Sequence, residues 1–313
     1  MPATVSINLC CYNSEKYLRE TLDSIVNQTY KDWELIVIND GSKDSTENIV
    51  QEYINKGYPF KYYYQHNKGL SYSRNKALEY SSGKYIAFID HDDIWLPEKL
   101  KNQVEALKTR PDVDFIYSNY FKKITYNNDK LILGLKGNQP QGFIFRDFIF
   151  KYEVFISTVI VSRNSLNSLD SLFDSRLRQL EEFDVFQRIL YKHKAMYLNE
   201  VTAIYRFHEN METMRSQETL LKEHPIILNK FKNLDPFFAE RHPDIIKYME
   251  IRWIIYINAK YDIINGKFQE ARNLISRHKW FSHKLLLLYM ATFLPQKLVL
   301  NIYYKKFFLR GKL

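Results

Sequence analysis

The feature that most constrains the fold is an alternation of short apolar runs with segments of helical periodicity, extending to about residue 117. Each run is long enough for a buried strand and is followed by turn-forming or helix-capping residues. The five runs are Val5–Leu9, Trp33–Ile38, Phe60–Tyr64, Tyr85–Ile89 and Val113–Tyr117. Strands that alternate with helices over short connections predict an α/β fold, with a mostly parallel sheet and right-handed crossovers.

The remaining chain gives a weaker pattern. The segment from Lys122 to Gln141 is polar and contains glycine, so we expect a loop or small hairpin near the functional site. Apolar spacing predicts a helix over Glu181–Tyr191 and one or two strands over Ala195–Phe207. From about Thr219 onwards the sequence predicts helices only.

Charge and composition limit the class of protein. The length of 313 residues suggests about two domains, and 45% hydrophobic residues argue against disorder. The net charge of +9 equals the nine basic residues that follow Glu270, after which no acidic residue occurs. A globally basic nucleic-acid-binding surface is therefore not indicated. Two cysteines, Cys10 and Cys11, give no disulfide framework and fit a reducing compartment, and we expect no secretory signal.

The apolar run Tyr85–Ile89 ends in three carboxylates, Asp90, Asp92 and Asp93. Carboxylates held close together repel one another, and a cation among them removes that repulsion. Oxygen ligands favour Mg²⁺ or Mn²⁺, and ligands of open α/β sheets bind beyond the carboxyl ends of the strands. The alternative is an acidic strand-to-helix turn in which Asp92 or Asp93 only caps the following residues.

Six segments together resemble the family 2 inverting glycosyltransferases of the GT-A fold, as found in bacterial surface-glycan synthesis. The likeness covers about residues 4–210, and the order and spacing of the segments make it specific. Two departures occur: Cys10-Cys11 replaces a usual Pro-Thr or similar pair, and Glu182 stands where the family usually has Asp. The segments are Val5–Leu9 with Tyr12-Asn13, Ser24–Thr29, Glu34–Thr46, Asn67–Asn75, Asp90–Asp93 and Glu181–Asp184.

The resemblance implies an organisation and a reaction. It implies a GT-A catalytic domain at 1–214, with a nucleotide-sugar-binding half at 1–110 and an acceptor half at 111–214. A helical C-terminal region with a basic amphipathic tail would occupy 215–313. The reaction would move a sugar from a nucleotide-diphosphate donor, preferably a UDP-sugar, to a hydroxyl of a saccharide acceptor with inversion.

The resemblance also assigns residues to the donor. Asp40 would accept a hydrogen bond from the nucleotide base, although a capping or turn role in Asp-Gly-Ser is the alternative. Cys10 and Tyr12 would line the base pocket, although buried small apolar residues are the simpler interpretation of the cysteines. Arg74 would face the nucleotide or its phosphates; by itself, an arginine on a helix is usually solvated.

The same resemblance assigns residues that would bind the metal and a residue that would act as the catalytic base. Asp90 would contact the ribose or the metal, and Asp92 would bind the Mg²⁺ or Mn²⁺ that bridges the diphosphate. His208 would lie near the metal or the diphosphate, although a lone histidine is more often a structural hydrogen-bonding residue. Glu182 would be the base that takes the proton from the acceptor hydroxyl. The alternative is that Glu181 and Glu182 are first-turn acids favoured by the helix dipole.

The end of the chain predicts a membrane surface as a partner. Lys284 precedes the apolar run Leu285–Leu294, and a second run, Leu298–Tyr304, has basic ends. Such runs are too short to span a bilayer but suit an interfacial helix on an anionic membrane. The alternative is packing of the last helices against the rest of the protein. The membrane interpretation implies a lipid-linked acceptor and a peripheral position at the cytoplasmic face of the cell membrane.

Two other functions stay open. A nucleotidyltransferase that makes a nucleotide sugar would also use an α/β sheet and acidic metal ligands, but the segment from Cys10 to Lys16 has no glycine for a phosphate loop. A non-catalytic, membrane-associated nucleotide-sugar-binding subunit is the second. The donor sugar, the linkage and the oligomeric state do not follow from the sequence.

Overall fold

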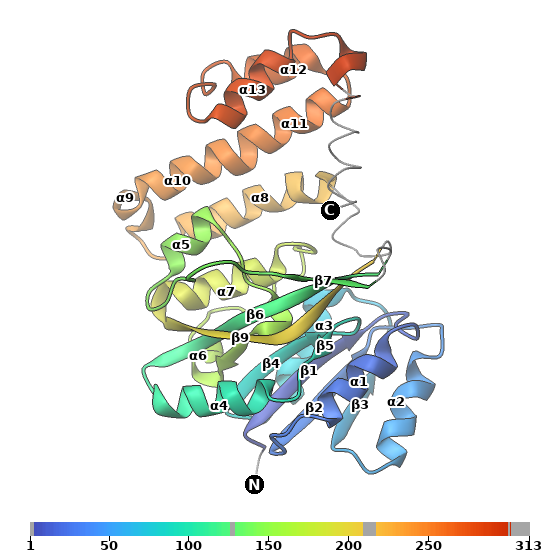
Figure 1. Cartoon of the computed structure of the whole chain (residues 1–313). Coiled ribbons are helices and arrows are strands. Elements are labelled where there is room, and N and C mark those ends of the chain that lie inside the picture. Colours follow the sequence, from blue (N-terminus) through green and yellow to red (C-terminus); the bar gives the residue numbers. More distant parts are fainter. Residues whose placement is uncertain (1–2, 126–128, 209–216, 300, 302–313) are drawn as a thin grey trace. The chain divides into compact units, whose positions relative to one another are not determined.

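The computed structural model describes residues 3–125, 129–208, 217–299 and 301 (Figure 1). The chain divides into two compact units, an N-terminal unit of residues 1–211 and a C-terminal unit of residues 212–313. The expected domain boundary at residue 214 lies outside the described residues, as does the end of the run Leu298–Tyr304.

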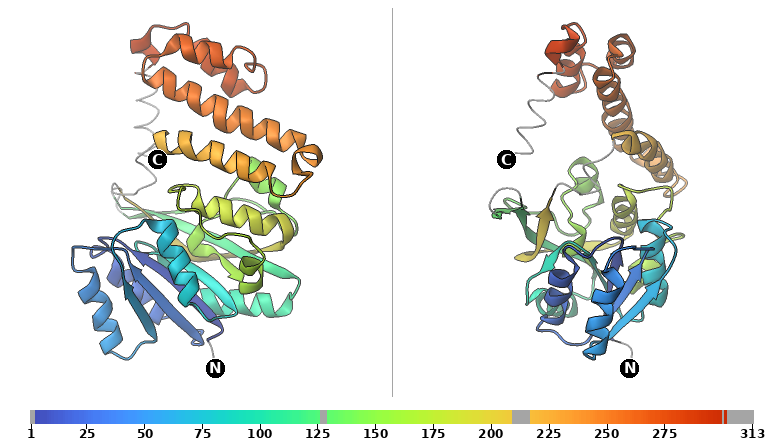
Figure 2. Two further views of the ribbon diagram at one scale, coloured as in Figure 1. Left: turned by 180° about the vertical axis from the view of Figure 1, so that it is seen from behind. Right: turned by 90° about the vertical axis from the view of Figure 1, so that its right-hand side faces the viewer.

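The first half of the N-terminal unit is the predicted parallel sheet. Its strands lie in the order β3-β2-β1-β4, and every neighbouring pair is parallel. The strands are β1 (Val5–Cys11), β2 (Trp33–Asn39), β3 (Phe60–Tyr64) and β4 (Tyr85–Asp90). The helices between them are α1 (Leu18–Val26), α2 (Thr46–Asn55) and α3 (Leu70–Tyr80). Because helices cover both faces, the middle strands β1 and β2 are buried along nearly their whole length (Figure 2).

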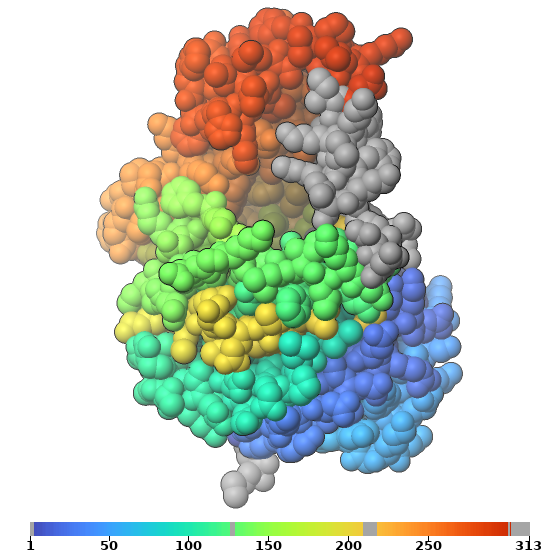
Figure 3. Space-filling model, viewed as in Figure 1, coloured from blue at the N-terminus to red at the C-terminus, as the bar shows by residue number. Residues whose placement is uncertain are grey.

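The second half of the sheet is mixed. A three-residue strand, β8, pairs antiparallel with both β4 and β6, and β9 then runs parallel to β6. Figure 3 shows the β6–β7 segment in green and β9 in yellow, adjacent on one face of this unit. The strands are β5 (Ile94–Trp95), β6 (Val113–Ile124), β7 (Lys130–Leu133), β8 (Ile160–Ser162) and β9 (Lys194–Phe207). Most paired residues in the whole sheet are parallel, so the predicted mostly parallel α/β architecture is confirmed.

Several local predictions for this half are confirmed by the structure. The predicted helix is present as α7 (Glu181–Lys192), and the predicted strand as β9. The polar segment from Lys122 contains the hairpin, since β7 pairs antiparallel with the end of β6. Residues 126–128 of that segment lie outside the described part. The elements that periodicity did not predict are β5, β8, α5 (Phe145–Phe150), the 3₁₀ turn η1 (Ile156–Thr158) and α6 (Arg163–Asn167).

The polar residues between β1 and the first helix connect separate elements. Helix α1 begins at Leu18, and Asn13 and Ser14 lie before it. The Ser14 backbone N–H donates to Thr46 Oγ1 at 2.8 Å, and the Ser14 hydroxyl accepts from the Tyr12 N–H at 3.0 Å. These bonds hold the end of β1 against the start of α2. Helix α4 (Lys99–Thr109) follows β5 in the chain.

Gly41 shapes the turn that follows β2. Its φ of +81° lies in the left-handed region, and an added Cβ would lie 2.8 Å from the Asn67 backbone nitrogen. Only glycine combines this backbone conformation with such a close approach. The turn after β2 therefore lies directly against the segment that leads into α3.

The described residues of the C-terminal unit form helices and their connections, as predicted. Helix α10 continues through a π-helical turn, η3, into α11, and this long helix lies between α8 and the α12–α13 pair (Figure 2). None of the helices within the described residues has the length and apolar character needed to cross a bilayer. The helices are α8 (Gln217–Lys232), α9 (Phe238–Arg241), α10 (Pro243–Met249), η3 (Glu250–Ile255), α11 (Tyr256–Ile264), α12 (Phe268–Ile275) and α13 (His283–Ala291).

Candidate active site

The polar residues singled out in the sequence gather at the carboxyl ends of β1, β2 and β4. Cys10 lies directly opposite Asp90 in the β1–β4 register, and Cys11 lies opposite Asn39 at the end of β2. Parallel strands bring their carboxyl ends to one edge of the sheet, where ligands of such sheets bind. Burial is the main cause that raises the pKa of Cys10 to about 12, so its thiol stays neutral.

Asp40 fastens this edge to the start of α3. Its carboxylate is 5% exposed and accepts hydrogen bonds from Gln65 Nε2 at 2.7 Å, the Lys68 N–H at 2.9 Å and the Gly69 N–H at 2.8 Å. Tyr12 lies at the end of β1 and is 48% exposed. The structure thus places Asp40, Cys10 and Tyr12 at neighbouring strand ends, with Asp40 ordering the loop between β3 and α3.

Arg74 links this edge to helix α7. Its Nη1 donates to Glu181 Oε1 at 2.8 Å and its Nη2 donates to Asp90 Oδ1 at 3.0 Å, although the guanidinium is almost fully buried. Burial alone would lower the pKa of Arg74, but the carboxylates of Asp90 and Glu181 outweigh it and raise that pKa. The guanidinium therefore stays charged and bridges two carboxylates from different parts of the sequence.

The acidic turn after β4 is held by the end of β9. His208 Nε2 lies 2.9 Å from Asp92 Oδ2, and Arg206 Nε donates to the Asp92 backbone oxygen at 2.8 Å. Arg206 also forms a forked ion pair with Glu20 on α1, with both N–O distances 3.1 Å. Burial would raise the pKa of Asp92, but the bond to His208 lowers it below the ordinary value. Asp92 is therefore an ionised carboxylate fixed from two directions.

Asp93 faces the interior instead. It is fully buried, accepts a hydrogen bond from the Ser157 hydroxyl at 2.6 Å and lies 3.3 Å from the Arg206 N–H. Burial, with the charges of Asp92 and Asp90, raises the pKa of Asp93 well above its ordinary value. Asp93 therefore anchors η1 below the acidic turn and is not a candidate ligand.

Two of the three residues expected to hold a metal are in direct contact, and the third, Asp90, is paired with Arg74. Asp92 and His208 are in hydrogen-bond contact, and the Asp90 side chain is 38% exposed. Within the described ranges, no group of three histidine, cysteine or acidic side chains is close enough to hold a cation without further ligands. Carboxylate and imidazole are suitable donors for Mn²⁺ or Mg²⁺, so the residues present fit such an ion.

Glu182 is the second residue of α7, directly after Glu181, and is partly exposed. Burial is the largest cause that raises the pKa of Glu182 to about 8; Arg74 opposes it, and the charges of Glu181 and Asp90 add to it. A carboxylate with a pKa near neutrality is suited to take a proton. Because the charge of Asp90 contributes to this shift, Glu182 is electrostatically connected with the acidic turn after β4.

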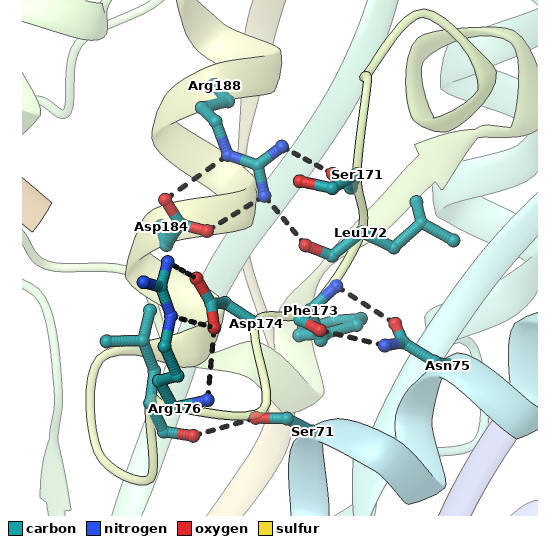
Figure 4. A network of polar contacts seen from close by, with 10 residues as sticks. Ser71, Asn75, Ser171, Leu172, Phe173, Asp174, Arg176, Asp184 and Arg188 are labelled. Atoms are coloured by element: carbon teal, nitrogen blue, oxygen red, sulfur yellow. Dashed lines mark hydrogen bonds and ion pairs between the residues drawn. The ribbon is translucent and has the colours of Figure 1, made fainter. Parts of the chain in front are cut away.

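The segment before α7 is fixed by the polar network in Figure 4. Asn75 on α3 forms two hydrogen bonds with the Phe173 backbone, at 2.8 and 2.9 Å, and the Ser71 hydroxyl donates to the Leu177 oxygen at 2.8 Å. From the α7 side, Arg188 donates to the Ser171 and Leu172 oxygens and pairs with Asp184. Because both helices hold this segment, the start of α7 is fixed relative to α3.

Sequence reasoning missed four contributors to the site. Ser157 and Arg206 support the acidic turn, Glu181 pairs with Arg74, and Tyr152 lies beside the two glutamates. The Tyr152 hydroxyl is buried and bonds to none of the described residues. Burial, followed by Glu182 and Glu181, raises the pKa of Tyr152 well above its ordinary value. The quoted motif segments included Glu181, whereas no local pattern distinguished Ser157 or Tyr152.

The fold and this set of side chains define a GT-A-type catalytic domain. The sequence profile described as "Glycosyl transferase family 2" matches residues 6–172, more than half of the chain. The chain belongs to glycosyl transferase family 2. This assignment confirms the resemblance and disfavours the nucleotidyltransferase alternative.

The sequence of this chain is similar to those of two bacterial glycosyltransferases. An uncharacterised glycosyltransferase of Rickettsia typhi is 29% identical over 223 residues, which are 67% of this chain and 65% of that protein. The Escherichia coli UDP-Glc:α-D-GlcNAc-diphosphoundecaprenol β-1,3-glucosyltransferase WfaP is 30% identical over 225 residues, covering 71% of this chain and 85% of that protein.

The structure of Staphylococcus aureus TarS 1–349 in complex with UDP-GlcNAc superposes with a TM-score of 0.66 at 19% identity. The match covers 98% of this chain and 92% of that one. At this identity the likeness concerns the fold, and it confirms the GT-A-type sheet followed by C-terminal helices.

Proposed function

We propose that the protein is an inverting glycosyltransferase that moves a sugar from a UDP-sugar to a hydroxyl of a lipid-linked saccharide, in bacterial surface-glycan assembly. The observation that carries this proposal is the link from Asp90 through Arg74 to Glu181, beside a glutamate whose pKa is raised to about 8. This link joins the acidic turn, where a donor diphosphate would lie, to a partly exposed candidate base. The similarity to WfaP, whose name specifies UDP-glucose and a diphosphoundecaprenol-linked sugar, supports both substrates.

On this proposal, the donor occupies the edge formed by β1, β2 and β4, in the half at 1–110. Asp40 and the exposed ring of Tyr12 contact the base, and Cys10 lines the same pocket. Asp90, Asp92 and His208 would hold Mg²⁺ or Mn²⁺ beside the donor diphosphate. Magnesium is commonly bound by one or two carboxylates plus substrate phosphates, which suits a set of this size. The bound cation would stabilise the negative charge that develops on the departing diphosphate.

The acceptor approaches from the half at 111–214, whose residues 209–214 lie outside the described part. Glu182 takes the proton from the acceptor hydroxyl while its oxygen attacks the anomeric carbon. The bond from that carbon to the diphosphate breaks on the opposite face, so the configuration inverts and UDP leaves. Tyr152, whose buried hydroxyl lies within the electrostatic influence of Glu182 and Glu181, would donate a hydrogen bond to the acceptor.

A donor-hydrolysis screen tests the proposal. Purified protein with Mn²⁺ or Mg²⁺ is incubated with UDP-, GDP- and dTDP-sugars, and released nucleotide is measured, with Asp92→Ala as the control. We expect slow release from one UDP-sugar that requires the metal and is absent in the variant. If no donor releases nucleotide, calorimetry with UDP follows, and the absence of UDP binding with metal present contradicts the proposal.

A further inference from the structure

Helix α13 is apolar on two opposite faces, and only one of them packs against other described residues of its unit. Leu285 is fully buried, and Leu288 packs against the same cluster, which includes Ile263 and Ile275. The other face carries Leu287, 62% exposed, and Met290, 55% exposed. A helix that is hydrophobic on all sides is normally covered on all sides.

The exposed apolar surface continues beyond the helix. The described residues from 280 to 298 contain seven large apolar side chains that are at least 40% exposed, so this is one continuous stretch of sequence. They are Trp280, Phe281, Leu287, Met290, Phe293, Leu294 and Leu298. Trp280, at 78% exposed, has the highest exposed fraction among them. Concentrated exposure of this kind marks a surface that binds a partner.

Cations accompany this surface. Arg277, Lys284 and Lys297 are exposed, and Lys279 lies over the rings of Trp280 and Tyr289 at 5.9 and 4.6 Å. The sequence has no acidic residue after Glu270 that could neutralise them. The surface therefore combines apolar side chains with uncompensated positive charge, which requires a partner that offers hydrocarbon and anions together.

Two alternative partners for this surface, a second copy of the protein and the segment 302–313, would not supply anionic groups. A second copy docked about a twofold axis would bring the same cations face to face. The segment 302–313 also carries only basic charged residues, Lys305, Lys306, Arg310 and Lys312. An anionic lipid bilayer supplies both properties, and tryptophan with flanking lysine is typical of the interface between headgroups and acyl chains.

We propose that Trp280, Leu287, Met290, Phe293 and Leu294 insert into the interface of an anionic lipid bilayer, with Arg277, Lys284 and Lys297 contacting its headgroups. The nine residues of α13 lie in the plane of the interface and do not span it. This surface lies wholly within the C-terminal unit, so the inference does not depend on the proposed reaction. Binding to a bilayer would bring the protein to the membrane in which a lipid-linked acceptor is anchored.

Cosedimentation of the full chain with vesicles tests the inference. Vesicles of phosphatidylcholine alone are compared with vesicles that also contain phosphatidylglycerol, at about physiological ionic strength, where surface charges are partly screened. We expect binding to the anionic vesicles only. Two variants should each bind the anionic vesicles with an affinity at least about tenfold lower than that of the wild type. They are the charge variant Lys284→Glu/Lys297→Glu and the apolar variant Leu287→Ser/Met290→Ser.

A matched control comes from the N-terminal unit. Leu131 and Leu133 on β7 are 49% and 40% exposed, so Leu131→Ser/Leu133→Ser removes comparable apolar surface elsewhere. This control should bind like the wild type, and circular dichroism should show that all variants are folded. Equal binding to both kinds of vesicle, or undiminished binding of the apolar variant, would overturn the inference. The inference would also be overturned if the wild-type protein self-associated without binding vesicles and the apolar variant no longer self-associated. Vesicle binding needs no turnover, so its outcome is separate from the donor-hydrolysis result.

Discussion

The two units differ in whether their charged groups are buried and paired, and in whether their exposed apolar side chains are scattered or concentrated. In the N-terminal unit the central charged groups are buried and paired over long sequence separations, as in Arg74 with Asp90 and Glu181. Its large exposed apolar side chains are scattered among the described residues from Tyr12 to Phe150. In the C-terminal unit, the stretch from 280 to 298 exposes apolar side chains next to cations.

The difference indicates two kinds of partner. A set of buried and mutually fixed charges is pre-organised for a small, highly charged ligand, because little reorganisation is needed when it binds. An apolar surface with exposed lysine charges suits a deformable partner such as a bilayer. Our proposals therefore place the chemistry in the first unit and the membrane contact in the second.

Removing the charge of Arg74 should produce the largest change in stability. In Arg74→Met the carboxylates of Asp90 and Glu181 lose their shared cation, and breaking such a buried pair costs about 3–5 kcal/mol of unfolding free energy. Urea denaturation measures this change. The double variant Arg74→Met/Glu181→Gln should recover part of the loss, because Glu181 then no longer needs a cation.

The exposed pair Arg19–Glu52 is the matched control for that prediction. Both side chains are about half exposed, so Arg19→Met should leave the denaturation midpoint almost unchanged. Equal effects of Arg74→Met and Arg19→Met would remove the contrast between fixed and solvated charges.

The pH dependence of transfer should follow the ionisation of Glu182. With its pKa raised to about 8, the carboxylate is mostly protonated at lower pH and cannot act as a base. We expect kcat/KM to rise about tenfold per pH unit from about pH 6 and to level off above about pH 8. UDP binding measured over the same range should change much less. A flat transfer profile below pH 8 would argue against Glu182 as the base.

The same pKa makes a prediction about stability. A carboxyl group with a raised pKa stabilises the folded state while it is protonated, below its ordinary pKa, and this contribution is lost as the pH rises toward 8. Glu182→Gln keeps a neutral side chain throughout. Its stability relative to the wild type should therefore increase between about pH 5 and pH 9 in urea denaturation.

Tyr152→Phe should have a moderate effect that is confined to the acceptor. Loss of one hydrogen bond corresponds to about a tenfold increase in the KM for the acceptor. Donor hydrolysis should stay unchanged, since the hydroxyl lies beside Glu182 and not in the acidic turn. An equal loss in donor hydrolysis would place Tyr152 on the donor side instead.

The smallest effect is expected on the outer face of α13. Leu287→Ala should change the free energy of unfolding by less than about 0.5 kcal/mol, as for other surface positions. Leu285→Ala, on the buried face of the same helix, should cost about 2–5 kcal/mol. Similar losses at both positions would mean that both faces pack within the protein, and that no surface is left for a bilayer.

The sequence predicted the first half of the sheet because its information is local. Strands β1 to β4 each have an apolar run bounded by turn residues, and the acids after β4 follow directly from that pattern. Their gathering at one edge then follows from parallel pairing. The C-terminal helices were predicted for the same reason, since apolar residues recur there at helical spacing.

The supports of the site were not predictable in this way. Strand β8 and the turn η1 have three residues each, too few for any periodicity. The bond from Ser157 to Asp93 joins residues 64 apart, and the bond from Arg74 to Glu181 joins residues 107 apart. Such contacts depend on tertiary packing, which no local pattern in a single sequence encodes.

The most direct test of the account is transfer by Glu182→Gln, compared with its binding of UDP. Glutamine has nearly the same shape but cannot take a proton, so transfer from the donor found in the hydrolysis screen to a diphosphate-lipid-linked saccharide should fall about 10²–10⁴-fold. Calorimetric binding of UDP with Mn²⁺ should stay within a few-fold of the wild type. Transfer at the wild-type rate by Glu182→Gln would contradict the account, because another group would then take the acceptor's proton.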